Sequence, residues 1–193
     1  MEHKKAIDYI IKRLKQELPS KLKYHSAQHT LSVMEAAEHL GESHNIGPHE
    51  MQVLLTAAAY HDSGFLNTYR NHEEESCKIA AEILPAYGFG DEETARINAM
   101  IMATKVPQKP ETLLEKILCD ADLTYLGEDN YEKISKTLHR ELSLNGIELD
   151  KNEWLEMQIN FLESHNYWTE DCRRKLSPKK QSLLNRLKSK MAS

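Results

Sequence analysis

Histidines and aspartates occur in this sequence at spacings that suit metal binding or hydrolytic chemistry. His25 and His29, in the stretch YHSAQHT, are four residues apart and therefore share one face of a helix. His61 and Asp62 stand side by side in TAAAYHDSG, directly after a run of small and apolar residues. A buried carboxylate is costly unless it is paired or binds a metal. We therefore expect His61 and Asp62 either to pair with residues from elsewhere in the chain or to bind a metal.

A third stretch, CDADL, places Asp120 and Asp122 within a segment that is typical of an apolar helix. Ile117, Leu118 and Leu123 flank the pair, so the helix that carries it is expected to be largely buried. In chain order, the three stretches supply histidine, then histidine with aspartate, then aspartate. This ordered set predicts a mixed nitrogen and oxygen site whose members come from separate helices.

The elements that must position these residues are predicted to be helices. Apolar residues of the N-terminal segment recur with helical spacing, and no segment shows the strict alternation of a strand. Prolines, glycines and capping residues place the expected helices at about 7–18, 26–41, 48–61, 71–85, 91–104, 111–126, 130–144, from 150 and from 169. Asn71, Asp91 and Thr169 are expected as caps, residues 63–70 and 105–110 as loops, and Pro178 as a break in the last helix. We expect one all-α domain over residues 1–193, with a core at about 20–130 and a helical extension at about 131–193.

Composition and charge exclude several classes of protein. No apolar run approaches the ~20 residues of a membrane span, and the N-terminal segment carries charges where a secretory signal would be apolar. We therefore expect a cytoplasmic location and no membrane partner. The three cysteines are far apart without a CxxC pair, which predicts reduced thiols. The net charge is −5 although the segment from Arg173 onward is basic, so the body is acidic and no nucleic-acid polymer is expected as partner.

The ordered histidines and aspartates resemble the H…HD…D pattern of the HD superfamily of metal-dependent phosphohydrolases. YHSAQHTLSV is similar to the family's first-ligand helix, AAAYHDSGF to the end of its HD helix, and ILCDADLTYLG to its last-ligand helix. The resemblance covers roughly residues 20–130 and implies an HD-domain helical bundle with a C-terminal helical extension. It implies metal ligands at the following residues: His29, His61, Asp62 and Asp122.

The last ligand is ambiguous between two aspartates. The family's last ligand commonly follows a small residue, which favours Asp122 after Ala121. Asp120 is then expected to lie behind the ligands, as a hydrogen-bond acceptor or as a partner of His29 or Lys116.

Two imidazoles and two carboxylates form a donor set that suits Mn²⁺, Fe²⁺, Co²⁺, Ni²⁺ or Zn²⁺ and suits Mg²⁺ less well. Four protein ligands leave room for water, whose pKa a divalent cation lowers toward about 7. The expected reaction is attack of metal-activated water on the phosphorus of a nucleotide or another small phosphate ester. Within that class, phosphomonoester or cyclic phosphodiester cleavage is favoured. The expected partner is a small phosphorylated substrate, and a homo-oligomer is compatible with the pattern.

Further catalytic roles are expected for residues near the ligands, and Asp62 itself is counted as catalytic. In some family members a histidine at the place of His25 faces the substrate and protonates the leaving oxygen; a structural hydrogen bond is the alternative. His72, in RNHEEES, is expected in the active site, with Glu73 orienting it or acting as a base. Lys105 stands at a helix end where other members have a histidine, and is expected to contact a phosphate; an exposed loop lysine is the alternative.

Several branches of the superfamily do not fit this chain. HDSGFLNTY lacks the Glu-Asp pair that alarmone hydrolases carry after the HD motif, and the HD-Gly-Tyr-Pro motif of cyclic-di-GMP phosphodiesterases is missing. The chain has no space for the insertions of dNTP triphosphohydrolases. Two alternatives stay open: a non-catalytic helical HD signalling or binding module, and a di-iron oxygenase-type HD protein, which needs more ligands than this sequence offers.

Overall fold

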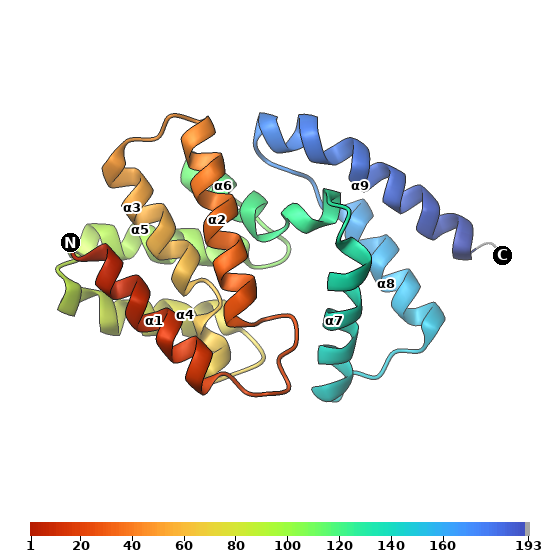
Figure 1. Ribbon diagram of the computed structural model, residues 1–193, viewed down its shortest axis with the longest axis horizontal. Helices are drawn as coiled ribbons and strands as arrows, with labels where there is room; N and C mark the ends of the chain where they lie inside the picture. Colours follow the sequence, from red (N-terminus) through yellow and green to blue (C-terminus); the bar gives the residue numbers. More distant parts are fainter. Residues whose placement is uncertain (192–193) are drawn as a thin grey trace. The chain divides into compact units, whose positions relative to one another are not determined.

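Helices joined by short turns make up the computed structural model, which describes residues 1–191 (Figure 1). No strand occurs among these residues, so the predicted all-α fold is confirmed. The α-helices are α1 (His3–Glu17), α2 (Ala27–Ser43), α3 (Pro48–Tyr60), α4 (His72–Ile83), α5 (Asp91–Thr104), α6 (Leu113–Asp122), α7 (Tyr131–Leu144), α8 (Lys151–Ser164) and α9 (Glu170–Met191). The short 3-10 helices are η1 (Ser63–Leu66), η2 (Leu84–Tyr87) and η3 (Thr124–Gly127). Within the described chain, none of the helices is both long and apolar enough to cross a bilayer.

Some predicted element boundaries are wrong. The expected loop after the HD motif begins with η1, and the sixth helix ends at Asp122, with η3 following after one residue. The ninth helix continues through Pro178. Proline in a helix interior costs about 3 kcal/mol, and leucines buried in the later turns of α9 offset that cost. They are Leu183, Leu184 and Leu187.

Two of the predicted caps differ from the structure. Asn71 occupies the N-cap position of α4 in the left-handed conformation, and its side chain makes no capping hydrogen bond within residues 1–191. Asp91 is the first residue inside α5, and Gly90 precedes it at the cap position. The Glu93 carboxylate accepts a hydrogen bond from the Gly90 N–H at 2.9 Å, so a glutamate in the first turn does the capping.

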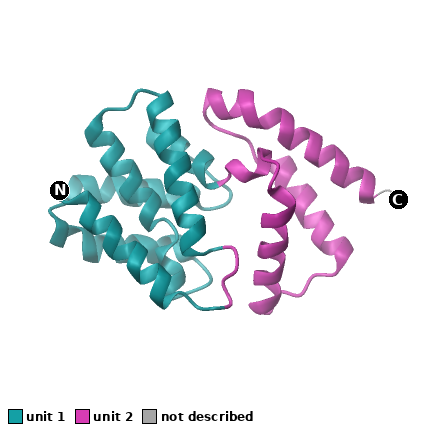
Figure 2. Ribbon diagram, in the orientation of Figure 1, with its two compact units in different colours: residues 1–20, 25–122 teal, residues 21–24, 123–193 magenta. Residues whose placement is uncertain are grey.

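The chain divides into two compact units (Figure 2). The first unit comprises Met1–Ser20 and His25–Asp122, and the second comprises Lys21–Tyr24 and Leu123–Ser193. That the whole chain forms a single HD domain stays a prediction.

Helix α3 lies at the centre of the first unit, where it packs against α1, α2, α5 and α6. Most residues of its second half, from Val53 to Tyr60, are buried, which explains why this half is largely apolar instead of showing one apolar stripe. Ala57, Ala58 and Ala59 are fully buried, and their small side chains let the neighbouring helices approach closely. The central helix therefore delivers the residues at its C-terminal end, His61 and Asp62, into the interior of the unit.

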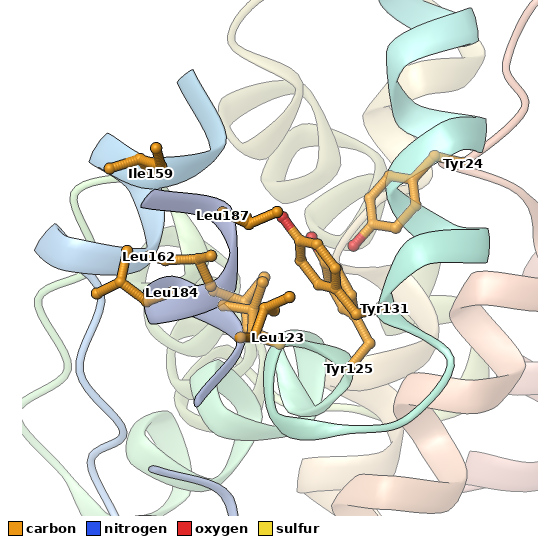
Figure 3. Packing of buried hydrophobic residues seen from close by; sticks show 10 residues of the cluster. Tyr24, Leu123, Tyr125, Tyr131, Ile159, Leu162, Leu184 and Leu187 are labelled. Carbon is orange, nitrogen blue, oxygen red and sulfur yellow. The ribbon is translucent and has the colours of Figure 1, made fainter. Parts of the chain in front are cut away.

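The second unit has a core of its own (Figure 3). Tyr125 packs against Tyr131 with ring centroids 6.2 Å apart, and against Tyr24 at 5.7 Å. The Tyr24 N–H also donates to the buried carboxylate of Glu141 at 2.7 Å. The segment just before His25 is thus held by this unit.

Basic side chains of α9 form ion pairs with acidic side chains of the same unit. Such exposed pairs contribute little to stability but reduce the positive field of the helix. The pairs are Arg174 and Lys175 with Asp171, Lys179 with Asp129, Arg186 and Lys190 with Glu132, and Lys188 with Glu163.

Candidate metal centre

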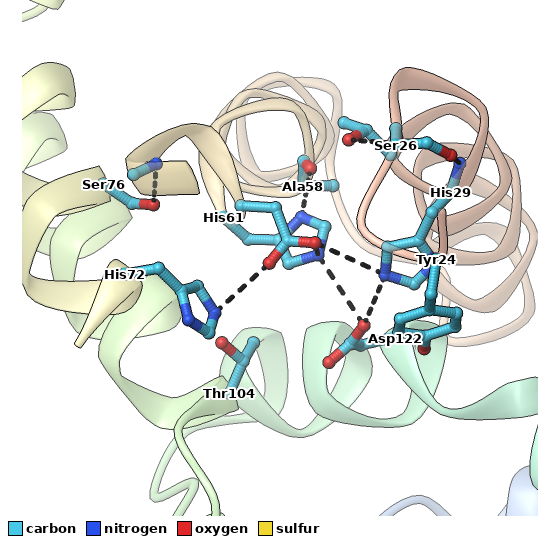
Figure 4. Close-up of polar contacts among 12 residues, drawn as sticks. Tyr24, Ser26, His29, Ala58, His61, His72, Ser76, Thr104 and Asp122 are labelled. Carbon is cyan, nitrogen blue, oxygen red and sulfur yellow. Dashed lines mark hydrogen bonds and ion pairs between the residues drawn. The ribbon is translucent and has the colours of Figure 1, made fainter. Parts of the chain in front are cut away.

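The four predicted ligands lie close together in the first unit, although they come from separate elements. Figure 4 shows three of them, His29, His61 and Asp122. His29 Nε2 lies 3.1 Å from Asp122 Oδ1 and 3.6 Å from Asp62 Oδ2. His61 Nε2 lies 3.3 Å from Asp62 Oδ2 and 3.6 Å from Asp122 Oδ1. One donor atom each of His29, His61 and Asp122 falls within 4.8 Å of the other two. Asp62 is outside that mutual group but contacts both imidazoles, so one cation could bind all four residues.

Local structure fixes the orientation of both imidazoles. Ser26 is the N-cap of α2, and its hydroxyl accepts a hydrogen bond from the His29 N–H at 3.3 Å, which sets where the first turn begins. His61 Nδ1 lies 2.8 Å from the carbonyl oxygen of Ala58, so this nitrogen donates. When the ring is neutral, its Nε2 carries the lone pair that faces the carboxylates, which is the tautomer that metal binding requires.

Burial and opposite charges control the protonation of the cluster. Burial by itself would lower the pKa of His61, but the negative charges of the adjacent Asp62 and Asp122 raise that pKa well above its ordinary value. Burial would raise the pKa of Asp62, but the adjacent His61 and His72 rings hold it well below its usual range. The pKa of Asp122 is also lowered, because the hydrogen bond from His29 and the adjacent His61 ring outweigh the effect of burial. The carboxylates are therefore ionised at neutral pH.

Two orphaned atoms show that this cluster fits a divalent cation. Within residues 1–191, neither His61 Nε2 nor Asp62 Oδ2 makes a hydrogen bond, although both atoms are buried. Buried polar atoms without a partner are costly, so they call for a ligand. Two imidazole nitrogens and two carboxylates are the donors that divalent transition metals prefer.

The geometry favours Asp122 over Asp120 as the last ligand. Asp122 is the final residue of α6, and its carboxylate reaches both imidazoles. Asp120 lies two residues earlier and is fully buried. Its expected role behind the ligands stays a prediction.

A family model described as the HD domain matches residues 26–125, which include all four predicted ligands. The chain belongs to the HD-domain family. HD domains bind divalent metals, in agreement with the cluster. No curated protein matches the chain.

Solved structures share the fold of this HD protein at low sequence identity. One is a predicted HD superfamily hydrolase from an uncultured Thermotogales bacterium, 21% identical, with a TM-score of 0.64; the match covers 98% of this chain and 92% of that chain. Bacillus subtilis YpgQ, crystallised in complex with ADP, is 16% identical with a TM-score of 0.65, covering 98% and 95%. A Lactobacillus plantarum protein is 14% identical with a TM-score of 0.71, covering 100% and 99%.

A second pair of histidines, His25 and His72, lies beside the candidate metal ligands of the HD domain. His72 Nε2 is 3.4 Å from Asp62 Oδ1, the carboxylate oxygen that does not face His61. The His25 ring centroid is 6.2 Å from that of His29 and 5.8 Å from that of His72. Glu73 is largely buried, and its carboxylate is 3.6 Å from His72 Nε2. The structure therefore brings together His25, His72 and Glu73, as expected for residues of one site.

Lys105 is engaged by a glutamate. Its ammonium forms an ion pair with the Glu74 carboxylate at the start of α4, and this is its one ion pair in the described chain. The hydrogen bond that Lys105 donates to Glu74 raises the pKa of Lys105. A phosphate contact by Lys105, which stays a prediction, would have to compete with Glu74.

Sequence reasoning missed the residues that hold η1 against α4. The Gly64 N–H donates to Ser76 Oγ at 2.7 Å, and Phe65 stacks on the rings of His25 and His72. The available signal was the glycine and aromatic residue directly after His-Asp in HDSGF. Their role depends on α4, which no local pattern places there.

Gly64→Ala is expected to destabilise the protein by about 3 kcal/mol or more, because overpacking against backbone leaves little room to relax. A Cβ at Gly64 would clash with the carbonyl oxygen of His72 and lie 2.8 Å from the Ser76 nitrogen. Gly47→Ala is the matched control, since a Cβ there has nothing within 4 Å. Urea unfolding of both variants measures the difference. Equal losses in the two variants would contradict the close approach of η1 and α4.

Metal binding near neutral pH is expected to release a proton. In the metal-free protein the raised pKa keeps His61 protonated, whereas a metal requires neutral imidazole. The release is therefore full below the raised pKa and disappears as the pH rises through it, so apparent metal affinity increases with pH. Calorimetric Mn²⁺ titration at neutral pH in two buffers of different ionisation enthalpy measures the released protons. Identical heats in the two buffers would contradict a protonated His61.

Proposed function

We propose that this HD protein is a metal-dependent phosphohydrolase that acts on a nucleotide or another small phosphate ester. The observation that carries the proposal is the cluster of two imidazoles and two ionised carboxylates, in which buried donor atoms lack hydrogen bonds. A divalent transition metal bound there supplies a Lewis acid that lowers the pKa of coordinated water and offsets phosphate charge.

The protein's own residues would divide the remaining work. His29 and His61 would hold the cation as neutral ligands, and Asp62 and Asp122 would balance its charge. His72 Nε2 lies 3.4 Å from Asp62 and 3.6 Å from Glu73, so two carboxylates near this nitrogen would orient the ring.

Substrate contacts would come from the residues around this cluster. His25 and His72 would donate N–H groups to phosphoryl oxygens, and one of them would protonate the leaving oxygen. Lys105 would contribute positive charge if a phosphate displaces Glu74. Mutual contacts of His25 and His72 on one aromatic ring support a shared task.

A small phosphorylated ligand is the partner that the comparisons support best. YpgQ, which shares the fold, is in complex with ADP. We extend that ligand class to this chain as part of the proposal, and favour phosphomonoester or cyclic phosphodiester bonds in nucleotides.

Hydrolysis of chromogenic esters tests the proposal and separates its two versions. Metal-stripped protein is loaded with Mn²⁺, Co²⁺, Ni²⁺ or Mg²⁺ and assayed with p-nitrophenyl phosphate, bis-p-nitrophenyl phosphate, ADP and cyclic AMP. Hydrolysis with a transition metal supports the proposal, and the preferred ester shows which bond is cut. Metal-loaded protein that hydrolyses no ester would favour the non-catalytic module, and two irons per chain with oxygen consumption would favour oxygenase chemistry.

A further inference from the structure

Phe65 stands directly after the HDSG sequence, on η1, and is 4% exposed. Its ring stacks on His25 with centroids 4.2 Å apart and an interplanar angle of 27°. It also stacks on His72 at 4.0 Å and 19°. One buried phenyl ring thus contacts both histidines that lie beside the candidate metal ligands.

The backbone keeps this phenyl ring in place. The Phe65 N–H donates to the carbonyl oxygen of Asp62 at 3.1 Å, so the ring follows the metal ligand through one tight turn. The neighbouring Gly64 packs against the backbone of His72 and donates to Ser76 Oγ at 2.7 Å. Phe65 is therefore fixed relative to Asp62 on one side and to the start of α4 on the other.

A planar aromatic contact restricts an imidazole in a way that an aliphatic side chain cannot. Offset-stacked rings favour nearly parallel planes, so Phe65 limits the side-chain rotation of His25 and His72. An imidazole that transfers a proton or contacts a phosphoryl oxygen must be placed closely, and a displacement of ~1 Å can cost ~10²-fold in rate. Carboxylates also orient the His72 ring, which lies beside Asp62 and Glu73.

We propose that Phe65 is a positioning residue that fixes the orientation of the His25 and His72 imidazoles beside the candidate metal ligands. The link from this positioning to turnover rests on the proposed hydrolytic function, whereas the positioning itself does not. Phe65 has no atom for proton transfer or metal binding, so its effect must pass through the two histidines.

The test compares Phe65→Leu with Phe89→Leu. Phe89 has the same 4% exposure in the same unit, so its replacement controls for the loss of a buried phenyl ring. Thermal unfolding checks that both variants fold. NMR of the metal-free proteins then follows the carbon-bound ring protons of His25 and His72, assigned with His25→Gln and His72→Gln variants. In the wild type we expect the stacked Phe65 ring to shift these protons upfield. Phe65→Leu is expected to lose that shift at both histidines, and Phe89→Leu to retain it.

Kinetics with the metal-loaded proteins test the consequence. Phe65→Leu is expected to lower kcat about 10- to 100-fold with little change in metal affinity, while Phe89→Leu keeps wild-type kcat. Adding Phe65→Leu to a variant that already carries His25→Gln and His72→Gln should cause no further loss. Unchanged histidine shifts in Phe65→Leu, or an equal loss of kcat in Phe89→Leu, would overturn the proposal. A wild type without hydrolytic activity would overturn the proposed function, and the NMR comparison would still decide the positioning.

Discussion

Asp62→Ala is expected to abolish metal-dependent hydrolysis, with a loss of about 10³-fold or more, the scale of removing a central electrostatic group. The Asp62 carboxylate lies within 3.6 Å of both ligand imidazoles and within 3.4 Å of His72. Its removal takes away a metal ligand and also the negative charge between three histidines. The measurement is metal affinity by equilibrium dialysis together with kcat for the ester that the wild type prefers.

Two further variants separate charge from shape at this position. Asp62→Asn keeps the shape of the side chain but not its charge, and should lose most of the activity as well. Asp91→Asn makes the same chemical change on the exposed first turn of α5 and should behave as wild type. Circular dichroism confirms that each variant is helical. Activity retained in folded Asp62→Ala would refute the assignment of Asp62.

Asp122→Asn and Asp120→Asn are expected to differ strongly in metal affinity, although the two aspartates are two residues apart on α6. Asp122 Oδ1 lies 3.1 Å from His29 Nε2 and 3.6 Å from His61 Nε2, so its replacement is expected to remove a ligand. We expect a loss of more than about 100-fold in metal affinity for Asp122→Asn. Asp120→Asn should cost no more than about 10- to 100-fold, the range of residues behind the ligands.

The pair of variants is its own control, because both replace a carboxylate of the same helix by an amide. Dialysis against Mn²⁺ at fixed pH measures both affinities, and urea unfolding of the metal-free proteins reports any loss of folding. A larger loss in Asp120→Asn would reverse the assignment of the two aspartates.

Periodicity and capping predicted most of the helices because each depends on nearby residues. Ser26 was expected to begin the second helix, and it caps α2. A helix was expected from residue 150, and Asp150 and Glu153 form both hydrogen bonds of a capping box at its start. Pro178 was misjudged because its local cost is outweighed by packing of leucines farther along α9, which lies outside any local window.

The order of the ligands in the chain predicted that they lie together, but it did not predict which residues His25 and His29 contact. The spacing of His25 and His29 predicted that they share one helix face, but α2 begins at Ala27 after the Ser26 cap, so His25 lies before the helix. His29 reaches Asp122, while His25 stacks on Phe65. The contact with Phe65 depends on how η1 approaches α4, which is a tertiary contact. Lys105 illustrates the same limit, since its partner Glu74 lies 31 residues earlier in the chain.

The proposal that this protein is a metal-dependent phosphohydrolase is tested most directly by measuring bound metal and ester hydrolysis in the same sample. The protein is stripped with a chelator, and Mn²⁺ is added back in steps while bound metal and the rate of hydrolysis are both recorded. Hydrolysis should be absent after stripping and should rise in proportion to bound metal over the first equivalent per chain. Hydrolysis that survives complete stripping, or full metal binding without hydrolysis of any phosphate ester tested, would contradict the account.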